Sequence, residues 1–188
     1  MTDFTRYTIE TATAEAKPLL EGSLKAYGMI PNLHAVLAES PEIYEAYREL
    51  NRLFAASSLS TVETHVVWLT LNVYHRCHYC VPAHTFLAYK DGVSEEIVTA
   101  LREERELPDA RLEALRQFTL AVARERGFVA PETVDAFIAA GFTKRNVFDV
   151  ILGLSHKVIS NYVNHIVDTP VDAPFAKFDW QPVRAAAE

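Results

Sequence analysis

Apolar residues recur at helical rather than alternating spacing along most of this chain. One such stripe, at positions i, i+4, i+7 and i+11, contains Ile43, Tyr47, Leu50 and Phe54. It follows Ser40-Pro41, a helix-start signal with serine as N-cap and proline at the first helical position. No segment alternates convincingly as a strand would. The pattern therefore predicts an all-α fold, a compact domain of about seven or eight helices.

Two predicted helices begin at N-cap residues. Ser60-Thr61-Val62-Glu63 fits a capping box, in which serine accepts from the third residue's N–H and glutamate reaches back. The helix that follows is apolar nearly all round, so it belongs in the middle of the core. Thr143 begins the longest periodic run, which continues to Ile166.

A shift of 83 residues places Leu59-Ser60 on Phe142-Thr143 and Tyr79 on Tyr162. This match suggests an internal duplication of a helical unit. Two amphipathic helices that align by chance explain it equally well.

The remaining patterns predict a single domain spanning 1–188, with a core of about 15–167. The segment 168–188 is rich in proline and carries three large aromatic residues, Phe175, Phe178 and Trp180. It is too apolar to remain in solvent and too rich in proline for a helix. We therefore predict an extended C-terminal tail that lies along a surface, either of this chain or of a neighbouring subunit.

Composition narrows the class of protein. Of the 188 residues, 49% are hydrophobic and 23% are charged, which is typical of a globular protein, and the net charge is −7. That charge argues against a nucleic-acid partner, because binding phosphates needs clustered lysine and arginine. No apolar run reaches the ~18 residues that a membrane span needs. The N-terminus lacks the pattern of a signal peptide, so we expect a cytoplasmic protein.

The only two cysteines lie three positions apart, and His84 follows the second by four. Proline is tolerated in an α-helix only in the first turn, so Pro82 predicts a helix that begins near residues 78–81. Cys80 then lies in the first turn, where free N–H groups and the helix dipole favour an anion. His84 shares a helical face with Cys80 and is able to donate to a thiolate or accept its proton.

Spacing also predicts a reactive disulfide. Helical i, i+3 neighbours have Cβ atoms ~5–6 Å apart, whereas a disulfide prefers ~3.5–4.5 Å. A strained Cys77–Cys80 bond would be labile. The motif therefore indicates thiol redox chemistry: one thiolate attacks the O–O bond of a peroxide and becomes a sulfenic acid. The other cysteine then condenses with it to a disulfide that a thiol or dithiol reductant protein reopens.

Other interpretations remain open. In one, the cysteines are two buried residues that meet by accident. In another, they bind a metal together with His84 and one of His65, His75 or His78. In a third, the chain is a non-catalytic redox sensor or an oligomeric interaction protein. Thioredoxin-type chemistry is disfavoured because it needs a βαβ context.

The motif resembles that of the AhpD-like alkylhydroperoxidase / carboxymuconolactone decarboxylase family. The resemblance rests on Leu59-Ser60-x-x-Glu63, the apolar helix, Cys77-x-Tyr79-Cys80-x-x-x-His84 and the Gly92 turn. Gly28-Met29-Ile30-Pro31-Asn32 and Asn161-Tyr162 are similar to the peroxidase-related branch, and the resemblance covers most of 15–180. It implies an antioxidant, peroxiredoxin-type enzyme that reduces organic hydroperoxides without a cofactor. It also implies an all-helical homo-oligomer, a trimer or hexamer.

The resemblance also implies roles for single residues. Cys80 matches the peroxidatic cysteine, Cys77 its disulfide partner and proton donor, and His84 the relay histidine. The family's relay glutamate falls on His65, and its histidine before the second cysteine falls on Tyr79. We favour His65 as the relay residue and keep Glu63 as second choice. Because these two lie ~200° apart around a helix, they cannot face one site together.

The decarboxylases of the family lack the cysteine pair. Its presence at Cys77 and Cys80 therefore argues against lactone decarboxylation by this chain.

Overall fold

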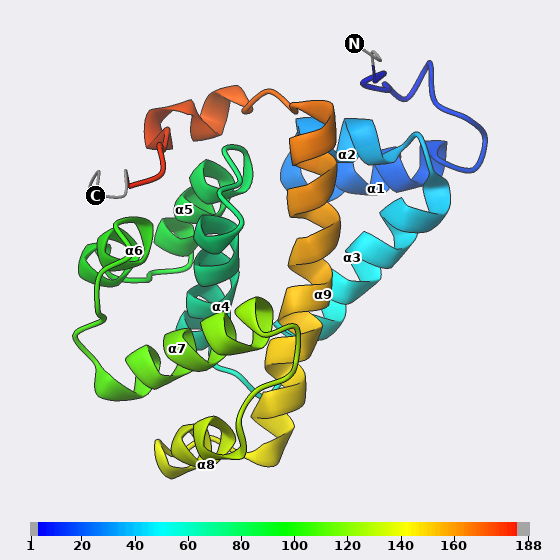
Figure 1. Ribbon diagram of the computed structural model, residues 1–188. Helices are drawn as coiled ribbons and strands as arrows, with labels where there is room; N and C mark the ends of the chain where they lie inside the picture. The colour runs from blue at the N-terminus through cyan, green and yellow to red at the C-terminus, as the bar shows by residue number, and fades with distance from the viewer. Residues whose placement is uncertain (1–3, 184–188) are drawn as a thin grey trace.

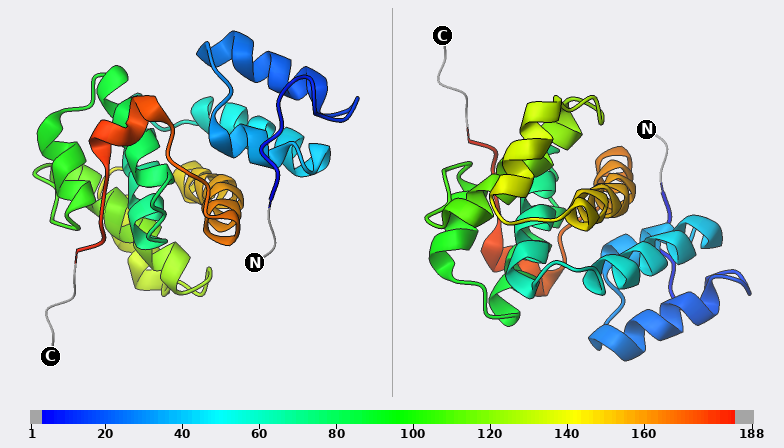
Figure 2. Two further views of the ribbon diagram at one scale, coloured as in Figure 1. Left: turned by 90° about the horizontal axis from the view of Figure 1, so that it is seen from above. Right: turned by 90° about the horizontal axis from the view of Figure 1, so that it is seen from below.

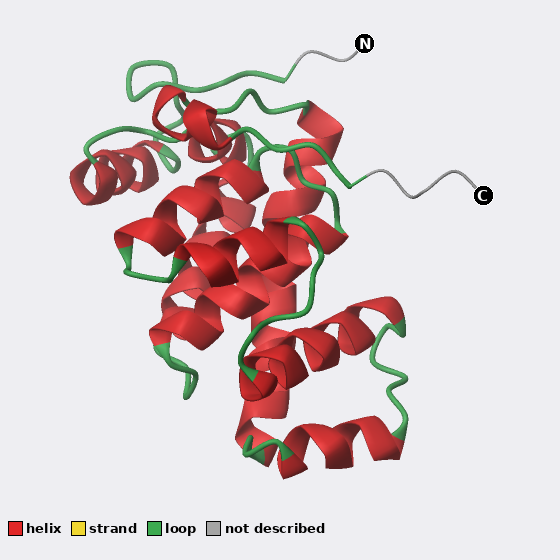
Figure 3. Cartoon of the chain, turned by 90° about the vertical axis from the view of Figure 1, so that its left-hand side faces the viewer, coloured by secondary structure: helices red, strands yellow, loops and turns green. Residues whose placement is uncertain are grey.

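The computed structural model describes residues 4–183, and every regular element within that range is helical (Figures 1 and 3). The all-α prediction is confirmed, although the nine α-helices and one 3-10 helix of the described residues exceed the predicted number. The elements are α1 (Lys17–Tyr27), α2 (Asn32–Leu37), α3 (Pro41–Ala55), α4 (Thr61–Tyr74), α5 (Cys80–Lys90), α6 (Glu95–Arg102), α7 (Ala110–Arg124), α8 (Pro131–Ala139), α9 (Lys144–Val167) and η1 (Ala173–Phe178).

Helix α4 forms the centre of the main core. It packs against α5, α6, α7 and α9, and its apolar residues Val66, Val67, Leu69 and Leu71 are fully buried. The predicted capping box is present, because the side chain of Ser60 accepts from the Glu63 N–H and Glu63 accepts from the Ser60 N–H. The cap therefore fixes where this buried helix begins.

Helix α9 separates two groups of helices. Figure 2 shows α1–α3 on one side of it and α4–α8 on the other, and α9 contacts both α3 and α4. Gly153 permits the close approach, since a Cβ there would lie 2.8 Å from atoms of Phe54 and of Val67. The residues that α9 buries are mostly polar, namely Asn146, Asp149, His156, Lys157, Ser160, Asn161 and Asn164. Part of its apolar stripe, including Phe148 and Ile166, faces outward.

The C-terminal segment differs from the extended tail that the sequence predicts. The proline-rich stretch forms η1, with Pro174 in its first turn, and the segment packs on its own chain. Phe175 and Phe178 pack against Phe86, and the Trp180 indole donates to Arg102 O at 2.9 Å. Residues 184–188 of the predicted tail lie outside the described range.

Both halves of the suggested duplication begin with a capping box, at Ser60 and at Thr143. The likeness ends there, because α9 continues unbroken to Val167 whereas α4 stops at Tyr74 and α5 begins anew at Cys80. None of the described helices is long and apolar enough to cross a membrane.

Candidate active site at the Cys77–Cys80 pair

The cysteine motif forms the junction between α4 and α5. Arg76 has a left-handed backbone (φ 55°), and the Cys77 N–H donates to Asn72 O at 2.9 Å. Helix α5 begins at Cys80, so this cysteine is the first helical residue and Pro82 lies in the first turn. The helix start predicted from Pro82 is confirmed.

The two thiols are both buried and free, and they contact each other. The Cys80 N–H donates to Cys77 Sγ at 3.3 Å, and Asn164 Nδ2 of α9 donates to Cys80 Sγ at 3.2 Å. The same amide nitrogen lies 3.9 Å from Cys77 Sγ. The two sulfur atoms therefore share a hydrogen-bond donor but are not equivalent.

A cavity of about 100 Å³ makes the difference between the thiols clear. Cys80 lines this cavity and Cys77 does not. His84 and Lys157 contribute its other titratable groups near Cys80. Its aromatic lining is formed by Tyr27, Tyr47, Trp68, Tyr79 and Phe175. A small apolar molecule in the cavity would therefore meet the thiol of Cys80.

Lys157 of α9 is a fully buried cation beside these groups. Its Nζ lies 2.8 Å from His84 Nε2. Burial and the charge of Lys157 keep the pKa of His84 well below its usual value, so the neutral imidazole accepts from the ammonium. Within residues 4–183, Lys157 forms no ion pair with a carboxylate.

A thiolate at Cys80 supplies the counter-charge. Burial alone raises the pKa of Cys80, but the hydrogen bond from Cys77 and the charge of Lys157 oppose it. Together with hydrogen bonds from Ser160 and Asn164, they lower this pKa to about 6. The hydrogen bond with Cys80, burial and the negative charge of Cys80 raise the pKa of Cys77. Near neutral pH the pair therefore consists of a Cys80 thiolate and a Cys77 thiol.

His65 lies behind Trp68 and does not line the cavity. Its ring centroid is 5.5 Å from that of Trp68, which in turn is 5.1 Å from the ring of His84. On its other side, His65 Nε2 lies 2.9 Å from Asp91 Oδ2. His65 thus packs against the indole that separates it from His84.

Both carboxylate oxygens of Glu63 are used elsewhere. One accepts from the Ser60 N–H in the capping box, and the other pairs with Arg111 of α7. The structure therefore brings Cys77, Cys80 and His84 together but leaves Glu63 outside the group.

Tyr79, which stands where the family has a histidine, ties the motif to the C-terminal segment. Its hydroxyl donates to Asp172 Oδ2 at 2.5 Å and accepts from the Leu33 N–H at 3.3 Å. Asp172 also accepts from the Asn32 N–H. The departure from the family pattern thus links α2, the motif and the C-terminal segment.

Sequence reasoning missed the contribution of α9. Lys157, Ser160 and Asn164 lie at i, i+3 and i+7, hence on one helical face. This spacing can be read from the sequence and indicates a polar stripe along the helix. However, a polar stripe on an amphipathic helix normally faces solvent, so only the packing of α9 shows that this one is buried.

The geometry does not favour the alternative in which the two cysteines and His84 bind a metal. No group of three histidine, cysteine or carboxylate side chains in the described part of the chain has a suitable arrangement. In addition, His84 Nε2 faces the ammonium of Lys157, which would repel a cation.

Comparison with known proteins identifies relatives. Residues 41–124 match the sequence model of the carboxymuconolactone decarboxylase family. No curated protein sequence matches this chain.

Several solved structures share the fold. One is an alkylhydroperoxidase AhpD core, an uncharacterized peroxidase-related protein from Ralstonia eutropha JMP134, with a TM-score of 0.80, 17% identity and coverage of 93% of this chain and 96% of that chain. An uncharacterized peroxidase-related protein from Silicibacter sp. TM1040 has a TM-score of 0.77 and 18% identity, with coverage of 93% and 95%. The debrominase Bmp8 has a TM-score of 0.77 and 16% identity, with coverage of 94% and 96%.

The family match runs from the first residue of α3 to the last residue of α7, and so includes both cysteines and His84. The shared fold extends over almost the whole chain. Residues 41–124 of this chain are therefore similar to the carboxymuconolactone decarboxylase family, and the chain shares its fold with the AhpD-like structures.

Proposed function

We propose that this chain is a thiol-dependent peroxidase that reduces organic hydroperoxides through a sulfenic acid and disulfide cycle at Cys80 and Cys77. One observation carries the proposal: the cysteine with the lowered pKa is the one that faces the cavity. Its neighbour, in hydrogen-bond contact, keeps its proton. Attack on a peroxide needs a thiolate, and the later disulfide step needs a second thiol beside it, so this arrangement suits both steps.

In the first step, the Cys80 thiolate attacks the terminal oxygen of the hydroperoxide. The O–O bond breaks, and its electron pair leaves with the alkoxide. The alkoxide takes a proton from the hydrogen-bonded Lys157–His84 pair and departs as the alcohol. Cys80 is oxidised to a sulfenic acid, which keeps the hydrogen of the terminal oxygen.

In the second step, Cys77 becomes the nucleophile. Its pKa is raised by the hydrogen bond with Cys80, by burial and by the charge on Cys80. The charge is lost once Cys80 is a neutral sulfenic acid, so oxidation of the first thiol removes one of the causes that keep the second protonated. Cys77 attacks the Cys80 sulfur, its proton goes to the departing hydroxyl, and water and the disulfide form. A dithiol reductant then reopens the disulfide, and Cys80 returns a proton to Lys157.

The test measures hydroperoxide consumption with a dithiol reductant for the wild type, Cys80→Ser and Cys77→Ser. We expect turnover only in the wild type. Without reductant, Cys77→Ser should consume about one equivalent of hydroperoxide and gain one oxygen by intact mass, because its sulfenic acid has no resolving partner within the chain.

Steady turnover by Cys80→Ser would refute the assignment of the nucleophile. If the wild type loses its two thiols stoichiometrically but shows no steady-state rate, the redox-sensor alternative is favoured instead.

A further inference from the structure

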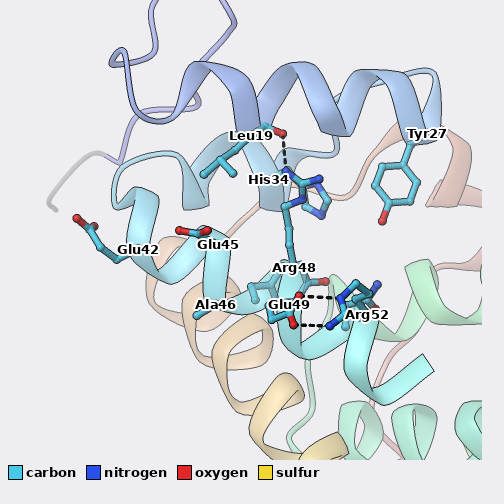
Figure 4. A pocket seen from close by; sticks show the side chains of 11 residues that line it. Leu19, Tyr27, His34, Glu42, Glu45, Ala46, Arg48, Glu49 and Arg52 are labelled. Carbon is cyan, nitrogen blue, oxygen red and sulfur yellow. Dashed lines mark hydrogen bonds and ion pairs between the residues drawn. The ribbon is translucent and has the colours of Figure 1, made fainter. Parts of the chain in front are cut away.

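A wide groove opens beside the Cys80 cavity, between α1 and α3 (Figure 4). Its volume is about 760 Å³. Four residues, Tyr27, His34, Tyr47 and Asn51, line both the groove and the inner cavity. The groove and the inner cavity therefore adjoin at these four side chains.

Arg48 lies in this groove with few partners. Its side chain is half-buried, and within residues 4–183 its only hydrogen bond is from Nη1 to Leu19 O at 3.5 Å. No described carboxylate lies within ion-pair distance of it. A guanidinium has five N–H donors, and leaving most of them unmatched in a half-buried site is unfavourable.

A glycine in α1 makes room for this guanidinium. A Cβ on Gly22 would lie 3.1 Å from Arg48 Nη2 and 3.2 Å from Nη1. Because glycine has no side chain, the planar guanidinium packs directly on the helix backbone. The guanidinium therefore packs on α1 without a counter-ion among the described residues.

The carboxylates of the groove do not neutralise Arg48. Glu49 is bound by Arg52, with contacts of 2.5 and 2.8 Å. Glu42 and Glu45 lie at the end of the groove away from Tyr27 (Figure 4). Of the two arginines that line the groove, Arg48 is thus the one without a carboxylate partner in the described range.

We propose that Arg48 binds a carboxylate group of the substrate, so that the preferred substrate is a carboxylate-bearing organic hydroperoxide. The hydroperoxide end enters the inner cavity while the carboxylate remains in the groove. The inner cavity, about 100 Å³, is smaller than the ~150 Å³ cavity known to hold benzene. The reacting end must therefore be small and apolar, and the larger remainder occupies the groove. This inference rests on the proposed peroxidase function.

The test compares hydroperoxy carboxylates of increasing chain length with their methyl esters, in the wild type and in Arg48→Gln. At the chain length that spans groove and cavity, the wild type should have a higher kcat/KM for the acid than for its ester. Arg48→Gln should lower this acid-to-ester ratio about tenfold, the effect of losing a charge-assisted pair. The ester corrects for general damage to the fold. Lys25→Gln removes one positive charge from the exposed end of α1, outside the groove lining, and should keep the ratio.

An acid-to-ester ratio that is equal in the wild type and Arg48→Gln overturns the inference, even if hydroperoxides are turned over. If no hydroperoxide is turned over, the proposed function fails. Calorimetry then measures carboxylate binding at Arg48 independently of turnover. The hydroxy carboxylate that corresponds to the product should bind Cys80→Ser about tenfold more tightly than Cys80→Ser/Arg48→Gln. Equal affinities would overturn the inference.

Discussion

At the scale of single residues, Lys157 and the hydrogen bond from Cys77 both favour the thiolate form of Cys80. The two groups line one cavity, and the positive charge of Lys157 is among the causes that lower the pKa of Cys80 to about 6. Burial favours the neutral thiol, so without a cation the thiolate would be costly. The reactivity of this cysteine therefore depends on a residue from another helix.

Replacing Lys157 should shift the pH dependence of the reaction between Cys80 and hydroperoxide. In a Cys77→Ser background, where a single thiol titrates, Lys157→Met should raise the pKa of Cys80 by about 1–3 pH units. The thiolate forms as pH rises through the pKa, so the rate with hydroperoxide should increase at a higher pH in the variant. Ultraviolet absorbance of the thiolate against pH measures the shift.

Lys90→Met is the matched control for this titration. Lys90 lies exposed at the end of α5, on the same helix as Cys80, and its loss changes the net charge equally. It should leave the midpoint in place, because exposed charges are screened by solvent. An unchanged midpoint in Lys157→Met would mean that the thiolate is stabilised by hydrogen bonds alone.

At the scale of elements, the two candidate relay residues at the start of α4 make different contacts. Glu63 closes the capping box and pairs with Arg111, whereas His65 contacts Trp68 next to His84. Glu63→Ala should therefore cost about 1 kcal/mol of unfolding free energy through loss of the cap. His65→Ala should instead lower kcat for hydroperoxide. Chemical denaturation and steady-state kinetics on both variants distinguish the two effects.

The opposite pattern would restore Glu63 as the relay residue. Glu63→Ala would then lose turnover while its denaturation midpoint stayed that of the wild type, and His65→Ala would keep its kcat.

The elements that the sequence predicts best are those with a local cause. The cap at Ser60, the cap at Thr143 and Pro82 each act within one helical turn, and each marks a helix start in the structure. By contrast, we did not predict the start of α1 at Lys17, which follows a turn at residues 14–16 and has Pro18 in its first turn. Pro174 likewise begins a 3-10 helix that we did not predict.

The sequence likewise predicts only the part of the candidate site that has a local cause. Cys77, Cys80 and His84 are close in the sequence, so helical geometry places them together. Lys157 and Asn164 reach them from α9 only because Gly153 lets that helix approach α4. Such a contact depends on the packing of distant helices, which spacing along one helix cannot reveal.

At the scale of the whole molecule, α9 has two functions in the fold. Its polar face completes the cysteine site, and its other face leaves large apolar side chains in solvent. On that outer face lie Phe148, Ile151, Tyr162 and Ile166, which fall within about 60° at 100° per residue. Phe148 and Ile166 are 70% and 72% exposed.

A second copy of the chain is the expected cover for this face. The family resemblance implies a homo-oligomer, and the end of the face adjoins an apolar groove of about 200 Å³ that Val36, Ile43 and Ile166 help to line. Aligned apolar side chains on a surface are typical of an interface rather than of a monomer. We therefore expect the wild type to be larger than a monomer by sedimentation velocity.

A charge on the outer face should dissociate this assembly. Ile166→Asp places a carboxylate where apolar contact is expected, so its sedimentation coefficient should fall toward that of a monomer. Phe128→Asp is the control, because Phe128 is 87% exposed in the connection between α7 and α8 and does not belong to α9. It should sediment like the wild type. If Ile166→Asp keeps the wild-type coefficient while Phe128→Asp changes it, the contact lies near α8 instead, and the outer face of α9 is free in the assembled protein.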